Sequence, residues 1–367
     1  MTSIGIVGAG AAAAAATYVL DETVPNVEIT VLEKSGGVCG RAATRRRGEV
    51  TYDYGANYVK SDDERVVELL TERLPSDGLV DVTDPIYTFD AGGTVSEGRD
   101  ADEHKWTYRA GLTQVAKRLF AETDATVHRR TRVEGVGRDD SADGETDESA
   151  QWRLTDADGE TWGPFDVLLL NPPAPQTAEL LATAGADWDT QARADLESAA
   201  RDVEYRTIWT ALLHYPFELD RPYYALVNTD REHEVGWVAR EECKPGHVPD
   251  GESLLVVQMS PGWSTARYDD PLSAVGADVA DRVATLLDDD RYREPDWTDD
   301  QGWRYALPDA DDVSRFTDAA VDESVLAPVA EEGLHVAGDW VAGEGRVTAA
   351  LWNGYDVGER IAERCST

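Results

Sequence analysis

Small residues near the start of the chain are spaced in a way that suits phosphate binding. The stretch GIVGAGAAAAAA places Gly8 and Gly10 between a short apolar run and an alanine-rich segment, with Ala13 as the third small residue of a GxGxxA fingerprint. Gly8 allows a tight turn, Gly10 lets the backbone approach a pyrophosphate, and Ala13 permits close helix packing. We expect the phosphates at the helix N-terminus, where free N–H groups and the helix dipole favour an anion.

An acidic residue follows this turn at the end of a second strand. Glu33 closes the alternating segment VEITVLE, and its carboxylate can accept both ribose hydroxyls of an adenosine. The succession of strand, helix and strand predicts a βαβ unit and hence a parallel sheet. A unit of this kind binds a dinucleotide, but it does not separate FAD from NAD.

A second glycine turn supplies that distinction. GGVCGRAATRRR at residues 36–47, followed by YDYGANYV at 52–59, resembles the second signature of the flavin amine oxidase superfamily. In that family the turn Gly-Gly-x-x-Gly-Arg follows the ribose-binding acid, and its arginine lies along the pyrophosphate. The matching residues here are Gly36, Gly37, Gly40 and Arg41. An arginine at this place offers the diphosphate a planar fork of donors.

The end of the chain resembles the segment that closes over the flavin in the same superfamily. It reads VAGDWVAGEGRVTAALWNGYDVGERI. The resemblance implies that Asp339, after Gly338, binds the ribityl chain and that the helix expected from Thr348 points its N-terminus at the isoalloxazine, where its dipole stabilises the anionic reduced ring. The expected contacts of a non-covalently bound FAD are Gly8, Gly10, Ala13, Glu33, Lys34, Gly37, Gly40, Arg41, Asn57, Val133, Gly338, Asp339, Val347 and Thr348.

Within the superfamily, further segments resemble the renalase-like branch. They are YDYGANYV at 52–59, EECKPGH at 241–247, QMSPGWS at 258–264 and WRYALP at 303–308. This resemblance implies oxidation of a small molecule, a reduced dihydropyridine such as an isomer of a nicotinamide nucleotide, by hydride transfer to FAD, with molecular oxygen as the electron acceptor. The closing segment departs from the branch, which more often has a Glu after the Val of RVTAALWNG.

Two other functions remain open. An amine oxidase or a desaturase of the same superfamily would share every FAD motif. Some amine oxidases use a Lys-held water near the flavin, for which Lys60, Lys105 and Lys117 are weak candidates. The second alternative is a flavoprotein that binds FAD without turnover and serves as a partner or sensor.

Aromatic residues are the expected wall of a flat substrate pocket. The cofactor carries hydride chemistry, so no catalytic acid or base is assigned. The candidates that would face the flavin are Tyr58, Trp303, Trp340 and Trp352, and each of them also suits a packed core. We expect no metal site, because neither the cysteines nor the histidines show ligand spacing: Cys39, Cys243, Cys365, His104, His214, His233 and His247.

The chain has 367 residues, enough for two domains. Four alternating segments between Thr207 and Met259 predict a second, antiparallel sheet. We therefore expect an α/β fold with a Rossmann-type FAD-binding domain and an α+β substrate domain. The expected ranges are 1–60, 107–175 and 330–367 for the first domain, and 61–106 and 176–329 for the second. The proline cluster after Asn171 is the expected crossing between them, since proline neither continues a helix nor donates to a sheet.

The composition is strongly acidic, with 72 Asp and Glu against 34 Lys and Arg and a formal charge of -38. Such a surface repels nucleic acid. A compact protein with this charge is suited to concentrated salt, so we expect the cytoplasm of an extreme halophile. The chain begins with a strand instead of a signal peptide, and no apolar run reaches eighteen residues, so we expect neither secretion nor a membrane span. Residues 141–150 are expected to be disordered or to form a solvated loop.

Overall fold

A computed structural model describes residues 1–98, 103–139, 150–184, 188–308 and 321–366. The chain forms two compact units. Unit 1 comprises Met1–Gly40, Val115–Glu204 and Pro308–Thr367, and unit 2 comprises Arg41–Gln114 and Tyr205–Leu307. Most of the expected loop at 141–150 lies outside the described residues.

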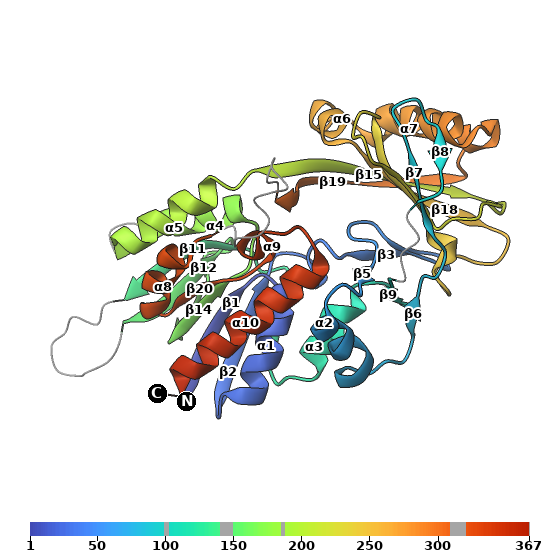
Figure 1. Cartoon of the computed structure of the whole chain (residues 1–367). Helices are drawn as coiled ribbons and strands as arrows, with labels where there is room; N and C mark the ends of the chain where they lie inside the picture. Colours follow the sequence, from blue (N-terminus) through green and yellow to red (C-terminus); the bar gives the residue numbers. More distant parts are fainter. Residues whose placement is uncertain (99–102, 140–149, 185–187, 309–320, 367) are drawn as a thin grey trace, which may run out of the picture. The chain divides into compact units, whose positions relative to one another are not determined.

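Unit 1 is built on a five-stranded sheet in the order β10-β2-β1-β14-β20 (Figure 1). All four strand pairs are parallel. Both faces of such a sheet are covered, which is why β1 and β14 read as almost continuous apolar runs. The strands are β1 Thr2–Val7, β2 Val27–Glu33, β10 Thr126–Arg129, β14 Val167–Leu170 and β20 Leu334–Val336. The predicted parallel sheet is confirmed.

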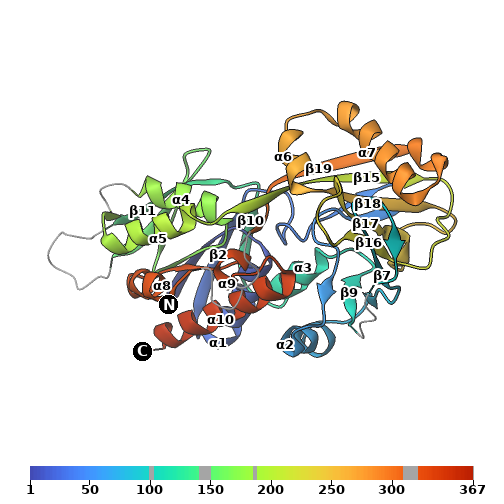
Figure 2. The same cartoon turned by 45° about the horizontal axis from the view of Figure 1, so that its top comes forward.

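Two helices of unit 1, α1 (Ala11–Thr23) and α10 (Val347–Cys365), run side by side along the sheet (Figures 1 and 2). Their backbones come so close that a Cβ added at Gly354 would lie 2.0 Å from the carbonyl oxygen of Ala12. The first and last segments of the chain are thereby packed together. The remaining elements of this unit are α4 Ala174–Thr183, α5 Gln191–Arg201, α8 Glu323–Glu331, α9 Asp339–Ala342, and the antiparallel strands β11 Val133–Asp139, β12 Gln151–Asp156 and β13 Thr161–Phe165.

Unit 2 contains a seven-stranded sheet in the order β19-β15-β18-β17-β16-β7-β8. The pairs that join β15, β18, β17 and β16 are antiparallel, as expected, whereas β16 pairs with β7 in parallel. Two helices, α6 (Pro261–Ala266) and α7 (Leu272–Leu287), cover one face of this sheet (Figure 2). The strands are β7 Ile86–Phe89, β8 Val95–Ser96, β15 Tyr205–Tyr215, β16 Ala225–Asn228, β17 Val235–Arg240, β18 Ser253–Met259 and β19 Trp297–Pro308.

Smaller elements complete the described chain. The segment 63–73 starts as an α-helix, capped by the Asp63 carboxylate, and continues as a π-helix. Their bounds are α2 Glu64–Glu68 and Leu69–Arg73. The other elements are β3 Thr44–Arg47, β4 Val50–Asp53, β5 Val59–Lys60, β6 Leu79–Asp81, β9 Lys105–Tyr108, α3 Gln114–Ala121 and the 3-10 turns Glu241–Cys243 and Asp290–Arg293. No helix in the described part of the chain is both long and apolar enough to cross a membrane.

The two units differ from the division expected from the sequence. The chain passes from unit 1 to unit 2 after Gly40 instead of after residue 60, and again after Glu204 instead of after residue 175. It returns to unit 1 at Pro308 instead of at residue 330. The proline cluster marks no crossing, because Pro173 is the N-cap of α4, which lies within unit 1. Proline is tolerated at this position because the first helical residues need no intrahelical N–H donor.

Candidate functional site

The first glycine turn of unit 1 has the backbone that its sequence predicts. Gly8 adopts a φ of +89°, and its N–H donates to the carbonyl of Leu32 at 2.8 Å. Gly10 is the N-cap of α1, and a Cβ there would lie 2.5 Å from Asn171 Oδ1. No side-chain cap to α1 is present among the described residues, so the first amides of this helix can bind an anion. Ala13, in the first turn of α1, is fully buried.

Glu33 holds the turn in place. Its side chain is 7% exposed, and its two oxygens accept from the N–H groups of Ala9 at 2.8 Å and Ser35 at 2.6 Å. Each carboxylate oxygen has a second lone pair, so the group can still accept hydroxyls. Glu33 therefore shapes the turn and keeps lone pairs for further hydrogen bonds.

The second glycine turn lies against the first. The N–H of Cys39 donates to the carbonyl of Ala9 at 2.8 Å, and a Cβ at Gly40 would lie 3.5 Å from Gly10 Cα. Gly40 has a φ of +55°, which favours glycine. Gly37 has open space around it. The two motifs thus form one surface of unit 1.

Two further predicted contacts lie beside these turns. Lys34 is exposed, and its ammonium donates to Gln176 Oε1 at 3.0 Å. Val133 is half-buried and begins β11. Both residues belong to unit 1.

Asn171, at the end of β14, was missed as a site residue by sequence reasoning. Its Oδ1 accepts from the N–H of Gly10 at 3.1 Å, and its Nδ2 donates to the carbonyl of Ala337 at 2.7 Å. It therefore joins the first glycine turn to the closing segment. The available signal was a polar residue directly after a buried strand, the same place that Gly8 occupies after β1.

The closing segment brings its predicted residues to the same edge of the sheet. The N–H of Gly338 donates to Asn353 Oδ1 at 2.8 Å, and Asp339, 5% exposed, begins α9. Val347 and the buried Thr348 form the first turn of α10, which lacks a side-chain cap among the described residues. Turns after β1, β2, β14 and β20 thus meet at the carboxyl ends of parallel strands, where open α/β sheets bind their ligands.

Two predicted cofactor residues belong to unit 2. The Arg41 guanidinium donates to the carbonyls of Tyr305 at 3.3 Å and Ala306 at 3.0 Å. Asn57 is 9% exposed, and its Nδ2 donates weakly to the carbonyl of Gly55 at 3.4 Å. Its Oδ1 is buried and has no partner among the described residues, so it has an unused capacity to accept a hydrogen bond from a ligand.

The aromatic candidates of unit 2 form stacked contacts. Trp303 stacks on Tyr54 with a centroid distance of 5.4 Å and an interplanar angle of 18°, and its Nε1 donates to the Tyr54 carbonyl at 3.1 Å. Tyr58 packs edge-on against Tyr224 at 6.2 Å. Trp303 is only half-buried, so part of its ring remains accessible.

The aromatic candidates of unit 1 differ from each other. Trp340 is 1% exposed, and its Nε1 donates to the carbonyl of Pro172 at 3.2 Å. Its surroundings are those of a core residue, because no open face of the ring remains for a substrate. Trp352 is half-buried on α10 and stacks on Tyr355 with a centroid distance of 4.8 Å.

Unit 2 also contains a buried ionic quartet, formed by Asp53, Glu241, Lys244 and His247. The Lys244 ammonium lies 2.9 Å from Asp53 Oδ2 and 3.0 Å from Glu241 Oε2, and His247 Nδ1 lies 2.7 Å from Glu241 Oε1. None of the four side chains is exposed. His247 therefore has a carboxylate neighbour that its spacing in the sequence did not indicate. His104 and His214 also have carboxylate partners, Asp81 at 2.6 Å and Glu252 at 2.8 Å.

The hydrogen bonds of His247 define its charge. Its Nε2 lies 2.8 Å from the carbonyl oxygen of Tyr108 and must carry a proton to donate, while Nδ1 faces the Glu241 carboxylate. Burial lowers the pKa of His247, but the hydrogen bond and charge of Glu241 and the charge of Asp53 outweigh it, so its pKa is raised. An imidazolium and an ammonium then balance two carboxylates, and the quartet is neutral.

The charge balance of the quartet also matters for whether it could bind a metal ion. Ligand atoms of Asp53, Glu241 and His247 lie within 4.8 Å of one another, as in a metal site. The Lys244 ammonium, however, contacts both carboxylates and so provides the cation that a metal would otherwise provide. Burial raises the pKa of Asp53, but the charges of Lys244 and His247 outweigh this effect and lower it. We therefore expect this cluster to have a structural role.

Comparisons with known proteins agree with this geometry. A family model for an NAD(P)-binding Rossmann-like domain matches residues 6–73, which include both glycine turns and Glu33. The solved structure of a candidate protoporphyrinogen oxidase from Exiguobacterium sp. 255-15 is 14% identical, with a TM-score of 0.77 over 99% of both chains. Cyclohexylamine oxidase from Brevibacterium oxydans IH-35A is 13% identical, with a TM-score of 0.70 over 100% of both chains. Putrescine oxidase bound to putrescine is 12% identical, with a TM-score of 0.70 over 99% of both chains. The protein shares the fold of these oxidases.

Proposed function

We propose that the protein is an FAD-dependent oxidoreductase that oxidises a reduced dihydropyridine of the nicotinamide-nucleotide type, with molecular oxygen as the acceptor. The observation that carries this proposal is the meeting of both glycine turns, Glu33 and the closing segment at one edge of the parallel sheet. The shared fold with oxidases supports the reaction class, and the resemblance to the renalase-like branch supports the substrate class.

The residues of unit 1 fit the requirements of FAD. Two helix N-termini, of α1 and α10, have no side-chain cap among the described residues, so their amides are available to negatively charged groups. Glu33 and Asp339 are buried carboxylates at the strand ends. Gly10 has no side chain, so the pyrophosphate can approach the backbone closely at this position.

Each group then has a role in binding. The amides at the start of α1 would hold the pyrophosphate, Glu33 the adenosine ribose and Asp339 the ribityl chain. The N-terminus of α10 would favour negative charge on the reduced ring. When bound, the flavin supplies the two-electron acceptor that hydride transfer needs. A dihydropyridine becomes an aromatic cation on losing hydride, so no residue has to remove a proton.

Amine oxidation is the second candidate, because two of the structures that share the fold are named for amine substrates. The lysines considered for a water-holding role do not separate the two functions. Lys60 pairs with Glu103 at 2.8 Å, and Lys105 is 8% exposed. A desaturase and a flavoprotein without turnover also remain alternatives.

The first test asks whether the protein binds FAD without a covalent link. Acid precipitation of the purified protein should release yellow FAD, since no cysteine lies where the superfamily's thioether linkage forms. Anaerobic addition of reduced dihydropyridine isomers of NAD(P)H should then bleach the flavin absorbance, and oxygen should restore it with formation of hydrogen peroxide. Bleaching by putrescine or cyclohexylamine instead would favour the amine oxidase. A flavin that none of these compounds bleaches would overturn the proposed substrate and favour a binding role.

We also propose that the protein works in a salt-rich cytoplasm. The formal charge of -38 supports this setting, because dense salt screens the repulsion between surface carboxylates. Its test is the salt dependence of stability described in the Discussion.

A further inference from the structure

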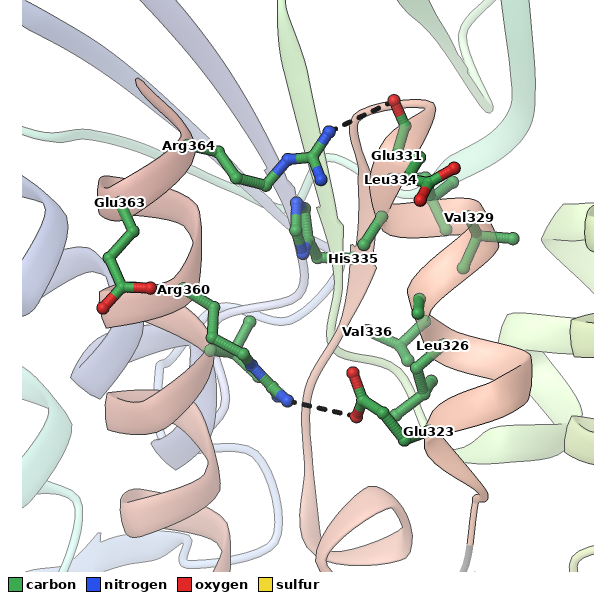
Figure 3. Close-up of a pocket in the computed structure, with 13 residues that line it drawn as sticks. Glu323, Leu326, Val329, Glu331, Leu334, His335, Val336, Arg360, Glu363 and Arg364 are labelled. Carbon is green, nitrogen blue, oxygen red and sulfur yellow. Dashed lines mark hydrogen bonds and ion pairs between the residues drawn. The ribbon is translucent and has the colours of Figure 1, made fainter. Parts of the chain in front are cut away.

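A crevice of about 260 Å³ in unit 1 contains charges of both signs (Figure 3). It is lined by α8, β20 and the C-terminal half of α10. Arg360 lies 3.5 Å from Glu323, and the Arg364 guanidinium donates to the backbone oxygen of Glu331 at 3.2 Å. Glu363 also belongs to the lining. Because acidic and basic side chains line it together, this crevice favours no class of ligand.

The large sheet of unit 2, in contrast, has polar groups in a row across β15, β18 and β17. Gln258 is the direct partner of Thr210 on one side and of Trp237 on the other. Direct partners point to the same face of a sheet, so these three residues form one row, the Gln258 row. Its face is the one opposite α6 and α7, because each member lies two positions from a residue of the core cluster on that face: Leu212, Val256 and Ala239.

A β-bulge turns Trp237 toward this face. Val235 pairs with Met259 and Trp237 pairs with Gln258, so Gly236 is an extra residue on β17. Val235 packs on the face that α6 and α7 cover. Without the extra residue, Trp237 would point to that same face. Bulges are common next to active sites, where they re-aim a side chain in this way.

The polar atoms of the Gln258 row lack partners. Trp237 Nε1 and Thr210 Oγ1 are buried and make no hydrogen bond among the described residues. Gln258 Nε2 donates to the carbonyl of Gly55 at 2.8 Å, while Gln258 Oε1 has no partner in the same part of the chain. Gln258 and Trp237 are only half-buried, so part of each side chain is open to solvent. Buried polar atoms are nearly always paired in native proteins, so this set points to a ligand.

The Gln258 row lies beside the predicted cofactor segment of unit 2. Its hydrogen bond to Gly55 joins it to residues 54–58, which include Asn57 and the aromatic candidate Tyr58. The ring of Tyr224 packs edge-on against both Tyr58, at 6.2 Å, and Trp237, at 6.3 Å. A planar ring bound at the row would therefore have aromatic neighbours.

The Gln258 row contains no charged side chain. The charges of the two carboxylates of the ionic quartet reach Tyr224, the neighbour of Trp237, but the quartet as a whole is neutral. The row therefore suits a neutral polar group better than an ion. Its open groups are one N–H donor, at Trp237, and one carbonyl acceptor, at Gln258.

We propose that the Gln258 row binds the carboxamide group of the substrate. Trp237 Nε1 donates to the carboxamide oxygen, and Gln258 Oε1 accepts from the carboxamide NH₂. An amide carries an acceptor and a donor side by side without charge, which matches these two groups. The inference rests on the proposed function, because it explains how a dihydropyridine of the nicotinamide type is recognised.

The test is a calorimetric titration of the FAD-loaded protein at constant KCl concentration with NAD⁺, the oxidised form of the proposed substrate. Two analogues differ from NAD⁺ only at the carboxamide: the acetylpyridine analogue keeps the carbonyl but lacks the NH₂ group, and the deamido analogue has a carboxylate. NAD⁺ should bind about tenfold or more tightly than either, because the first leaves Gln258 Oε1 unpaired and the second finds no cation in the row. Equal affinities, or no saturable binding of NAD⁺, would overturn the proposal.

Trp237→Phe should weaken the binding of NAD⁺ and of the acetylpyridine analogue alike, by about tenfold, because both present a carbonyl to the indole N–H. Trp263→Phe is the matched control. Trp263 Nε1 is also buried and unpaired among the described residues, but its ring packs against Trp209 in the core cluster on the opposite face. Losses of the same size in both variants, or no loss in Trp237→Phe, would exclude the contact with Trp237.

Gln258→Met tests the acceptor. It should bring the affinities for NAD⁺ and the acetylpyridine analogue together, because it removes the oxygen that distinguishes them. This ratio is independent of any general weakening that follows from losing the hydrogen bond to Gly55. A preference for NAD⁺ that persists in this variant would contradict the role of Gln258.

A melting experiment separates binding from a structural role. Trp237 Nε1 has no partner among the described residues, so Trp237→Phe should leave the melting temperature of the FAD-loaded protein unchanged or higher without NAD⁺. The rise in melting temperature on adding NAD⁺ should be smaller than in the wild type. A lower melting temperature without NAD⁺ would show that this N–H stabilises the fold, and would overturn its assignment to the substrate.

These results can be separated from the proposed function. If dihydropyridine isomers bleach the flavin but affinity depends neither on the carboxamide nor on Trp237, the oxidase is supported and this inference is wrong. If NAD⁺ binds with the expected preference but no dihydropyridine bleaches the flavin, the recognition is supported and the proposed oxidation is wrong.

Discussion

The Lys244 ammonium lies 2.9 Å from the Asp53 carboxylate, and neither side chain is exposed to solvent. Asp53 also accepts hydrogen bonds from Thr44 Oγ1 at 2.6 Å and from the N–H of Leu112 at 2.8 Å. One buried carboxylate thus joins β3, β4, the segment after β9 and the turn that contains Lys244. The residues that follow Asp53 directly are Tyr54 to Tyr58, which include Asn57, whose Oδ1 has no partner among the described residues. The ion pair therefore fixes the base of a predicted cofactor segment.

Lys244→Met should destabilise the protein by about 3 to 5 kcal/mol, because it leaves two buried carboxylates without their ammonium. The free energy of unfolding is measured by urea titration at constant KCl concentration. Lys60→Met is the control, since Lys60 pairs with Glu103 at a partly exposed site and should cost no more than about 1 kcal/mol. Equal losses in both variants would contradict the role assigned to Lys244.

Stability should also depend on the charge of His247. Its folded-state pKa is raised above the ordinary value of 6.5, so its contribution is fully present below pH 6.5 and is lost as pH rises through the folded-state pKa. The difference in unfolding free energy between wild type and His247→Gln should therefore shrink as pH rises from about 6 to about 9. Urea titrations at each pH measure it. A difference that stays constant or grows over this range would show that the imidazolium does not stabilise the fold.

Glu33→Gln should weaken FAD binding more than about tenfold, because an amide cannot accept from both backbone N–H groups and the ribose hydroxyls. Flavin occupancy after dialysis is the measurement. Asp339→Ala should act in the same direction through the ribityl chain. Glu28→Gln is the matched control, since Glu28 lies on the same strand and is exposed. Full occupancy in the Glu33 variant would exclude its ribose role.

Gly10→Ala should reduce FAD occupancy and lower the melting temperature, because its Cβ would lie 2.5 Å from Asn171 Oδ1. That contact forces either the side-chain amide or the turn to shift. Gly137→Ala, where a Cβ meets nothing within 4 Å, should leave both measurements nearly unchanged. The double variant Gly10→Ala, Asn171→Ala removes the clash. If it melts no higher than Gly10→Ala alone, Asn171 is not the cause.

Stability should rise steeply with salt. The Debye length falls from about 30 Å at about 0.01 M to about 3 Å at about 1 M, so surface carboxylates stop repelling one another. Flavin retention should follow, because the FAD pyrophosphate adds charge to a protein that already carries -38. Thermal melts followed by flavin fluorescence at several KCl concentrations measure both, with sucrose as the control for exclusion effects. A melting temperature that is flat between about 0.1 and about 2 M KCl would remove the basis for a salt-adapted setting.

Much of unit 1 could be predicted from the sequence because its motifs are local. The positive φ of Gly8 and the end of β2 at Glu33 depend on a few neighbouring residues, so residue type and spacing were enough to predict them. The same holds for the start of α10 at Val347, one residue from the expected helix start at Thr348, whereas the short helix α9 was not expected. The parallel sheet followed from the βαβ order.

The tertiary structure decided what depends on contacts between distant residues. Asn171 meets Gly10 across 161 positions, and Lys244 meets Asp53 across 191, separations at which no sequence pattern identifies the partner. The sequence does not show which of its tryptophans belong to the core. Trp340 is buried because of the packing around α9. The proline cluster opens α4 instead of ending a domain, because the helix that follows packs within unit 1. Local backbone conformation depends on residues that are neighbours in the sequence, whereas burial and charge pairing depend on how the whole chain packs.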